Sequence, residues 1–204
     1  MNKIILKGLI RKIEYSHTIG TIEYDKAELI VPKANGEEDV LPLRFKKYCN
    51  KYEEGTQIEL LGNLRSYSEK DENGKNHVHL YVFTYFDIPN ETDENDNEII
   101  NQFTVSGRIC KIDELRTTKS GKQNIHFILA NNIISNNGQK LNTYLPCVAF
   151  GKTAIEISQM HVSDQIEIIG RLNSRIYEKH LSEDEIEFRT AYECLVSTVN
   201  PVEI

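Results

Sequence analysis

The sequence has no tryptophan and only four cysteines among 204 residues. The cysteines are Cys49, Cys110, Cys147 and Cys194, and no two of them form a Cys-x-x-Cys pair. This spacing indicates neither a zinc site nor a disulfide framework. We therefore expect reduced, buried thiols in a cytoplasmic protein.

Long apolar runs and catalytic motifs are absent as well. No stretch approaches the roughly 20 apolar residues that span a membrane, and no signal peptide is evident at the start. There is no Gly-x-Ser-x-Gly, Walker-type loop, His-Glu-x-x-His or cluster of paired carboxylates. His77 and His79 share a predicted strand face but lack a third ligand. We expect no membrane contact, no enzyme activity, no cofactor and no metal.

The formal net charge is −7, an unfavourable value for a protein that binds nucleic acid. The deficit is concentrated in one segment, because residues 91–100 hold five acidic and no basic side chains. Residues 1–90 hold 13 Lys/Arg against 14 Asp/Glu, and residues 101–204 hold 11 against 12. A local basic surface therefore remains compatible with the composition. The acidic segment itself predicts a solvated linker between two domains.

Two motifs occur twice in the same order, which predicts a tandem duplication. Gln57-Ile-Glu-Leu-Leu-Gly-Asn-Leu64 matches Gln165-Ile-Glu-Ile-Ile-Gly-Arg-Leu172. Upstream, Gly8-Leu-Ile-Arg-Lys-Ile-Glu14 matches Gly107-Arg-Ile-Cys-Lys-Ile-Asp113. The predicted domains are residues 1–90 and 101–204, joined by the linker 91–100.

Each half has the pattern of five strands separated by turn signals such as Asn35-Gly36 and Asn137-Gly138. A short helix is predicted between the third and fourth strands, at 152–160 in the second half and weakly at 48–52 in the first. This order is that of an OB-fold, a small Greek-key barrel that binds oligonucleotides or oligosaccharides. The fold class is therefore mainly all-β, with two tandem OB-folds. The predicted strands are 4–14, 21–31, 40–45, 57–67, 78–88, 103–109, 125–129, 144–150, 165–175 and 188–199.

Strand parity separates an inner from an outer face on the repeated strand. If Ile166, Ile168 and Leu172 point into the barrel, then Arg171, Asn173, Arg175 and Tyr177 lie on the other face. The same parity groups Asn63, Arg65 and Tyr67 in the first half. Alternating cations and rings suit a single nucleic-acid strand, because cations meet phosphates and rings stack on bases. A solvated strand face would show the same pattern.

Further candidates lie near this strand. Arg116, Lys119 and Lys122 crowd a loop beside Gly121, where a phosphate could approach the backbone. The alternative is a flexible polar hairpin. Tyr144 and Phe150 share parity on the third strand, and Phe150 is the better candidate for a structural role.

The second half resembles the OB domain of bacterial single-stranded-DNA-binding proteins. The resemblance is carried by Val105-Ser-Gly107-Arg-Ile109, Phe127-Ile-Leu-Ala130, Leu145-Pro-Cys-Val-Ala-Phe-Gly-Lys152 with Ala154 and Glu156, Ile168-Ile-Gly-Arg-Leu172, and Arg189-Thr190. The first half is more distant, since Lys46-Lys47 follows Phe45 where the family has Gly-Lys. The resemblance implies binding aromatics at Tyr144, Phe150 and Tyr177, where the family often has Trp. The family's long tail with an acidic tip is not seen after the last predicted strand.

Together these features predict sequence-non-specific binding of single-stranded DNA in replication, recombination or repair. The resemblance further implies a homodimer carrying four OB-folds, with replication or recombination proteins as partners. One alternative is an OB-fold interaction module of a replication or mobile-element complex, in which one half has lost contact with DNA. Another is RNA binding. The predicted DNA-binding residues are Lys7, Arg11, Arg44, Arg65, Tyr67, Arg108, Arg116, Lys119, Lys122, Tyr144, Phe150, Lys152, Arg171, Asn173, Arg175, Tyr177 and Arg189.

Overall fold

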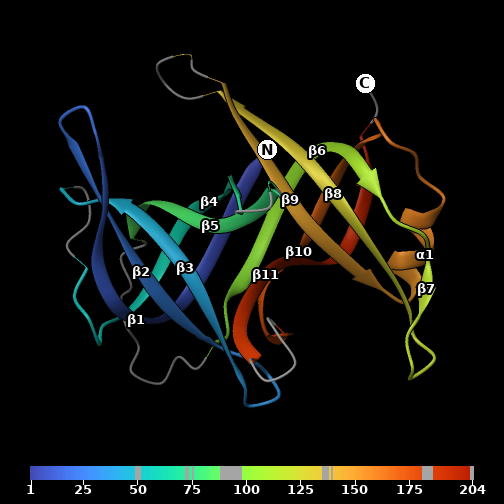
Figure 1. The fold of residues 1–204 in the computed structure, drawn as a ribbon, viewed down its shortest axis with the longest axis horizontal. Helices are drawn as coiled ribbons and strands as arrows, with labels where there is room; N and C mark the ends of the chain where they lie inside the picture. Colours follow the sequence, from blue (N-terminus) through green and yellow to red (C-terminus); the bar gives the residue numbers. More distant parts are fainter. Residues whose placement is uncertain are drawn as a thin grey trace.

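The computed structural model describes residues 1–48, 52–71, 74, 76–87, 98–134, 138, 140–180 and 186–202, without the side chains of 85–87, 133 and 180. Figure 1 shows two barrels side by side, one from each half of the chain. The strands of the first half are β1 (Asn2–Ile19), β2 (Ile22–Pro32), β3 (Glu38–Lys46), β4 (Gln57–Lys70) and β5 (Asn76–Asp87). Those of the second half are β6 (Asn101–Ile112), β7 (Arg116–Thr117), β8 (Gln123–Ile134), β9 (Lys140–Phe150), β10 (Gln165–His180) and β11 (Ile186–Pro201).

Both halves have the same strand pairing, which confirms the predicted OB-fold order. In the first half β1 pairs with β2 and β4, β2 with β3, β3 in parallel with β5, and β5 with β4. In the second half β6, β8, β9, β11 and β10 close a ring with the same pairing. The helix α1 (Lys152–Ser158) follows β9, and its residues Ala154 and Ile157 are buried. The helix predicted at 48–52 falls largely outside the described residues.

Several strands are longer than the hydrophobic pattern of the sequence predicts. β10 runs five residues beyond the predicted end at residue 175, and the two-residue strand β7 lies where a loop was predicted. The extended part of β10 pairs with β11 as a hairpin that leaves the barrel. Its residues bury no continuous core, so period-two hydrophobicity could not mark them as a strand.

The parity of the repeated strand is confirmed for the core. Ile166, Ile168 and Leu172 are at most 1% exposed, as are Leu60 and Leu64 of the first copy. The cysteines only partly follow the prediction. Cys147 and Cys194 are buried and unpaired, but Cys110 is exposed, and Cys49 lies outside the described residues. Burial and the adjacent Cys194 thiol raise the pKa of Cys147 well above its usual value, which makes that thiol unreactive.

The repeated glycines explain why both motifs recur. A Cβ on Gly8 or Gly107 would lie within 3 Å of the carbonyl oxygen of Ile30 or Ala130 on the neighbouring strand. A Cβ on Gly62 or Gly170 would be blocked in the same way by the carbonyl oxygen of Phe83 or Leu195 on the adjacent strand β5 or β11. Because only glycine lets two backbones approach this closely, these positions fix the barrel curvature of both halves.

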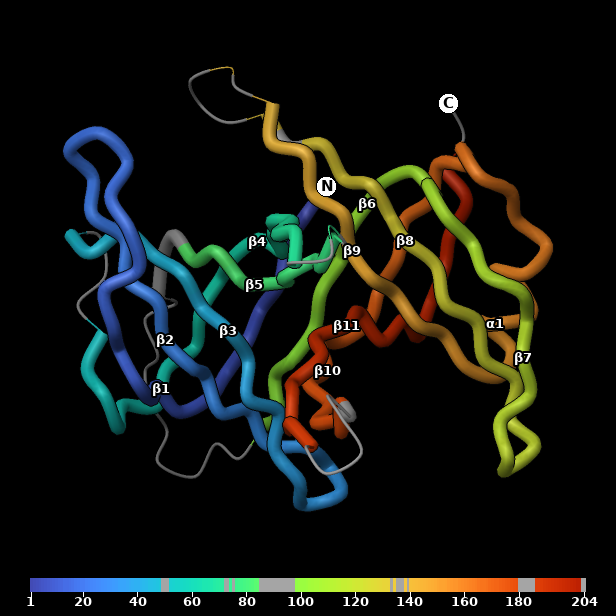
Figure 2. The backbone as a smooth tube through the Cα atoms, viewed as in Figure 1, coloured from blue at the N-terminus to red at the C-terminus, as the bar shows by residue number. Residues whose placement is uncertain are grey.

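The two barrels join through their first strands. β1 and β6 pair antiparallel, with Ile4 opposite Phe103, and one eleven-stranded sheet results. Figure 2 shows β6 running through the middle of the molecule between the two barrels. Ile4 and Phe103 occupy matching places in the repeat, counting from Gly8 and Gly107. The two halves are therefore related by an approximate twofold axis at this pairing.

Matched hydrogen bonds occur both within and between the halves. Within each half, the Asn2 side chain bonds the backbone N–H and carbonyl of Leu64, and the Asn101 side chain does the same to Leu172. Two further bonds join one half to the other. The N–H of Val40 donates to Ser174 Oγ at 3.0 Å, and that of Tyr144 donates to Ser66 Oγ at 2.9 Å. The hairpin β2–β3 thus rests on β10, while β8–β9 rests on β4. These side-chain contacts hold the halves at one mutual orientation.

Candidate nucleic-acid interface

Four planar side chains form a cluster on the outer face of the first barrel, which we term the aromatic platform. Its members are Arg44, Tyr67, His79 and Tyr81. The guanidinium carbon of Arg44 lies 4.6 Å from the ring centre of Tyr67 and 4.5 Å from that of Tyr81. Tyr67 and His79 face each other across β4 and β5 and stack with ring centres 4.9 Å apart. Tyr67 is 40% exposed, so much of the platform is open to a ligand.

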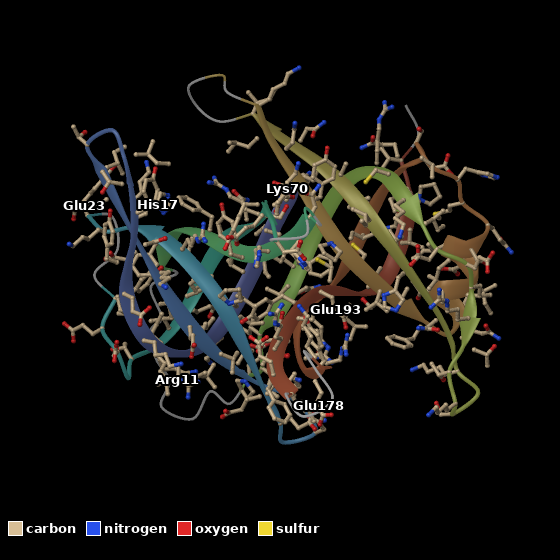
Figure 3. The ribbon with its side chains drawn as sticks, viewed as in Figure 1. Arg11, His17, Glu23, Lys70, Glu178 and Glu193 are labelled. Atoms are coloured by element: carbon tan, nitrogen blue, oxygen red, sulfur yellow. The ribbon has the colours of Figure 1, made fainter. Side chains whose placement is uncertain are left out.

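A second series of stacked side chains lies beside the platform on the same sheet. Arg65 lies over the ring of Phe83, with its guanidinium carbon 3.8 Å from the ring centre. Beyond Phe83 come Tyr24, at 6.2 Å, and His17, which stacks on Tyr24 at 4.8 Å. Figure 3 places His17 at the end of the β1–β2 hairpin. Burial and the charge of Arg44 lower the pKa of His17 below 6.5, which keeps this ring neutral at pH 7.

The matching surface of the second half carries no such cluster. Strand pairing puts Arg175 opposite Ala191, where the first half has Tyr67 opposite His79. By the same register, Glu193 of the second half occupies the position that Tyr81 has in the first half. The Nε of Arg175 lies 4.0 Å from a carboxylate oxygen of Glu193. Among the described residues, every ring–ring contact belongs to the first half.

The outer face of β10 is divided between two environments. Arg171 lies opposite to the core, as its parity predicts, but its guanidinium is 3.3 Å from the buried carboxylate of Asp39 in the first half. Asn173 lines a hollow between the halves together with Arg11 and Lys33. Arg175 lines the same hollow, and Tyr177, further along the strand, lines another hollow beside the β4–β5 hairpin. Parity alone could not show that the first part of this face is an interface between barrels.

Exposed cations gather at the far end of the second barrel, and we term them the basic cluster: Arg116, Lys119, Lys122 and Lys152. The N–H of Thr118 donates to the carbonyl of Lys122, which folds the predicted loop into a tight turn at Gly121. Gly151 N–H donates to Gln123, bringing Lys152 beside this turn. Lys122 Nζ lies 5.3 Å from the ring centre of Phe150, which is half-buried at the surface. Phe150 is thus outside the barrel core.

The remaining predicted residues have mixed surroundings. Lys7 is only 7% exposed, so its ammonium cannot meet a strand on the surface, and we withdraw it. Arg11 donates two hydrogen bonds to Glu28, and Arg189 pairs with Glu187 at 2.7 Å. Arg108 is exposed on β6, and Tyr144 is 43% exposed on β9.

The histidine pair has partners other than a metal. His77 Nε2 lies 2.9 Å from Asp71, and His79 Nε2 lies 3.5 Å from Glu69. Each imidazole therefore has a carboxylate beside it, and the ring of His79 also stacks on Tyr67 in the aromatic platform.

The sequence and the fold are similar to those of known proteins. The family model "Single-strand binding protein family" matches residues 100–201, half of the chain. The chain belongs to the single-strand binding protein family. A wild-type single-stranded DNA binding protein from Thermus aquaticus is similar in structure, with a TM-score of 0.71, 20% identity, and coverage of 100% of this chain and 94% of that one. A deletion mutant of the Thermus aquaticus protein gives a TM-score of 0.73 at 17% identity, covering 100% and 95%. No curated protein matches the sequence.

The family match covers the second half, whereas the aromatic platform lies in the first. Sequence reasoning found Arg44, Arg65 and Tyr67 but missed Tyr81 and His79. Their signal was available, since β5 reads His77-Val-His79-Leu-Tyr81, with the polar and aromatic residues two apart and Leu80 buried between them. Applying the parity rule to the partner strand of β4 would have identified them.

Tyr192 is a second residue that the sequence did not single out. It projects from β11 toward the first half and lines three hollows, one of which, of about 230 Å³, opens on the aromatic platform. The largest, about 930 Å³, separates the β4–β5 hairpin from the β10–β11 hairpin. Burial and the charge of Glu28 raise the pKa of Tyr192. Its hydroxyl is therefore a neutral hydrogen-bonding group at the place where the two halves meet.

Among the described residues, no helix is long and apolar enough to cross a membrane.

Proposed function

We propose that this chain binds single-stranded DNA with little sequence preference, by stacking bases on exposed rings and pairing phosphates with exposed cations. The family match and the OB-fold architecture support this function. The observation that carries it is the aromatic platform, in which Arg44, Tyr67 and Tyr81 present planar groups on an open barrel face. Every base has a flat π-face, so such a surface accepts any sequence.

The platform favours a single strand over a duplex. Bases in a duplex already stack on their neighbours, and their faces are not available to a protein ring without distortion. Unpaired bases can be splayed out and stacked on Tyr67, His79 or Tyr81. RNA would offer the same faces, and only contacts to its 2′-OH could separate the two. Competition between matched DNA and RNA strands belongs to the test for that reason.

The same proposal covers assembly and partners. A homodimer of this chain would bring four OB-folds together, and mass measurement of the free protein tests this. Replication or recombination proteins are expected partners, and a cytoplasmic location is part of the proposal. The two domains, 1–90 and 101–204, and the linker 91–100 remain part of the proposal, since most of the linker lies outside the described residues. The alternative of a first half without DNA contact is disfavoured by the platform it carries.

The test is titration of a fluorescently labelled oligo-dT strand at several salt concentrations, with a duplex of equal length as competitor. We expect tight binding at low salt, weakening as salt rises, because released counterions drive phosphate contacts. The duplex should compete poorly. Failure to bind oligo-dT at low salt, or equal binding of the duplex, would overturn the proposal.

A further inference from the structure

We propose that the two halves divide the binding work, with the first half stacking the bases and the second half holding the phosphates. This inference rests on the proposed function and adds a different role for each barrel. The two barrels share one fold, yet the side chains at matching outer positions differ in kind.

The first half has the means to hold bases. The aromatic platform joins three rings and a guanidinium on neighbouring strands, and a hollow of about 230 Å³ opens on them. Arg44 has no ion pair with a carboxylate among the described residues, so its guanidinium plane serves as part of the stacking surface. Several other cations of this half are already in ion pairs. Arg11 and Lys12 pair with Glu28, Lys26 with Glu14, and Lys47 with Glu23.

The second half lacks the rings at these positions. Arg175, Ala191 and Glu193 replace Tyr67, His79 and Tyr81, as the strand registers show. On β9, Val148 occupies the position that Arg44 has on β3, because it pairs with β8 as Arg44 pairs with β2. Val148 is buried. Tyr144, Phe150 and Tyr177 are separate from one another, since none of them makes a ring contact with another in the described structure. A base could meet one ring here but not a continuous surface.

The second half instead has unpaired cations. Arg116, Lys119 and Lys122 form no ion pair within the described part of the chain, and Lys152 is 91% exposed with a loose contact of 3.6 Å to Glu156. The tight turn at Gly121 exposes backbone beside three of these cations. A phosphate binds to such a group of charges through long-range attraction and needs no ring. Backbone contact of this kind is independent of base identity.

The division predicts different effects for two sets of variants of the full chain. The first set is the double variant Y67A/Y81A, with Y67F/Y81F as a control that keeps the rings. The second set is K119A/K122A, with K3A/K140A as a control that removes two charges elsewhere. Each protein is titrated with oligo-dT and with an abasic deoxyribose-phosphate strand of equal length, over a range of salt concentrations.

We expect Y67A/Y81A to lose about tenfold or more in affinity for oligo-dT, because the bases lose the rings on which they stack. Its affinity for the abasic strand should stay within about threefold of wild type. K119A/K122A should weaken both ligands alike and reduce the salt slope by about 1.4, since each single-strand phosphate contributes about 0.7. Both control variants should resemble wild type, and circular dichroism confirms that each protein is folded.

The outcomes separate the two proposals. A wild-type protein that binds no oligo-dT overturns the proposed function itself. A wild-type protein that binds, with Y67A/Y81A unchanged on oligo-dT, overturns the division alone. So does an equal loss on both ligands for the ring variant. A base-specific loss in Y144A/Y177A that exceeds the loss in Y67A/Y81A would place the stacking in the second half and contradict the inference.

Discussion

Asp39 of the first half accepts two hydrogen bonds from Ser174 of the second, at 2.8 Å from its N–H and 3.0 Å from its hydroxyl. The Asp39 side chain is 1% exposed, and Lys33 and Arg171 neutralise it at 3.0 and 3.3 Å. At the matching place in the repeat, the second half has the uncharged Thr143, which is also buried. One of the two matching contacts between the barrels is thus ionic, and the other is not. The approximate twofold symmetry holds for the backbone but is broken at this contact.

Replacing Asp39 by Ala should destabilise the protein by about 3–5 kcal/mol, because a buried ion pair that loses one partner leaves an uncompensated charge. The Ser174 N–H would also lose its acceptor. Urea unfolding followed by circular dichroism measures the change. The matched control is E37A on the same hairpin, where the side chain is 68% exposed and the effect should stay within about 0.5 kcal/mol. Equal effects of the two changes would show that the Asp39 contact does not stabilise the interface.

Gly170→Ala should also destabilise the protein, by about 1–3 kcal/mol, because the added methyl group meets the backbone carbonyl of Leu195. Strand backbone cannot yield as a side-chain tip can. Gly36→Asn is the control, since nothing lies within 4 Å of its Cβ position and Asn tolerates the left-handed conformation there. Denaturant midpoints of the two variants give the comparison. A wild-type midpoint for Gly170→Ala would refute the close-approach explanation of the repeat.

Arg171→Ala should lower stability while leaving the salt dependence of DNA binding unchanged. The reason is that the Arg171 guanidinium is engaged by Asp39 and is not available to a phosphate. Denaturant unfolding and an oligo-dT titration at several salt concentrations are measured on the same preparation. A drop in the salt slope of about 0.7 would mean that Arg171 does contact a phosphate, as its parity alone suggests.

His17 should titrate below 6.5 in the free protein, since burial and the charge of Arg44 lower its pKa. The unfolded chain then binds this proton more readily than the folded one. The stability that depends on neutral His17 is complete above pH 6.5 and is lost as the pH falls through the lower folded pKa. Ring-proton NMR, assigned with H17Q, measures the value.

R44Q should raise the His17 pKa, because it removes a nearby positive charge. R11Q, at a site paired with Glu28, should leave the pKa unchanged. A wild-type His17 that titrates at or above 6.5 would contradict the assigned surroundings.

The sequence predicted the fold more completely than the site. Hydrophobic alternation and repeated glycines determine the barrels, because inward residues such as Ile168 and Leu172 must alternate with outward ones. The outer face carries no equivalent constraint. Arg171 and Arg175 have the same parity, yet one holds the other barrel and the other lies near Glu193. Which outward residues meet a second domain depends on the β1–β6 pairing, which brings together segments about a hundred residues apart. The aromatic platform likewise required the register of β4 against β5.

The central claim, that bases lie on the aromatic platform, is tested most directly by photo-crosslinking. An oligo-dT strand carrying 5-iododeoxyuridine is bound to the full chain and irradiated, and the attached peptides are identified by mass spectrometry. Tyr15 and Tyr48 are 59% and 65% exposed but lie off the platform, so they serve as internal controls. We predict attachment at Tyr67 or Tyr81. Attachment confined to Tyr15, Tyr48 or the second half would contradict the account.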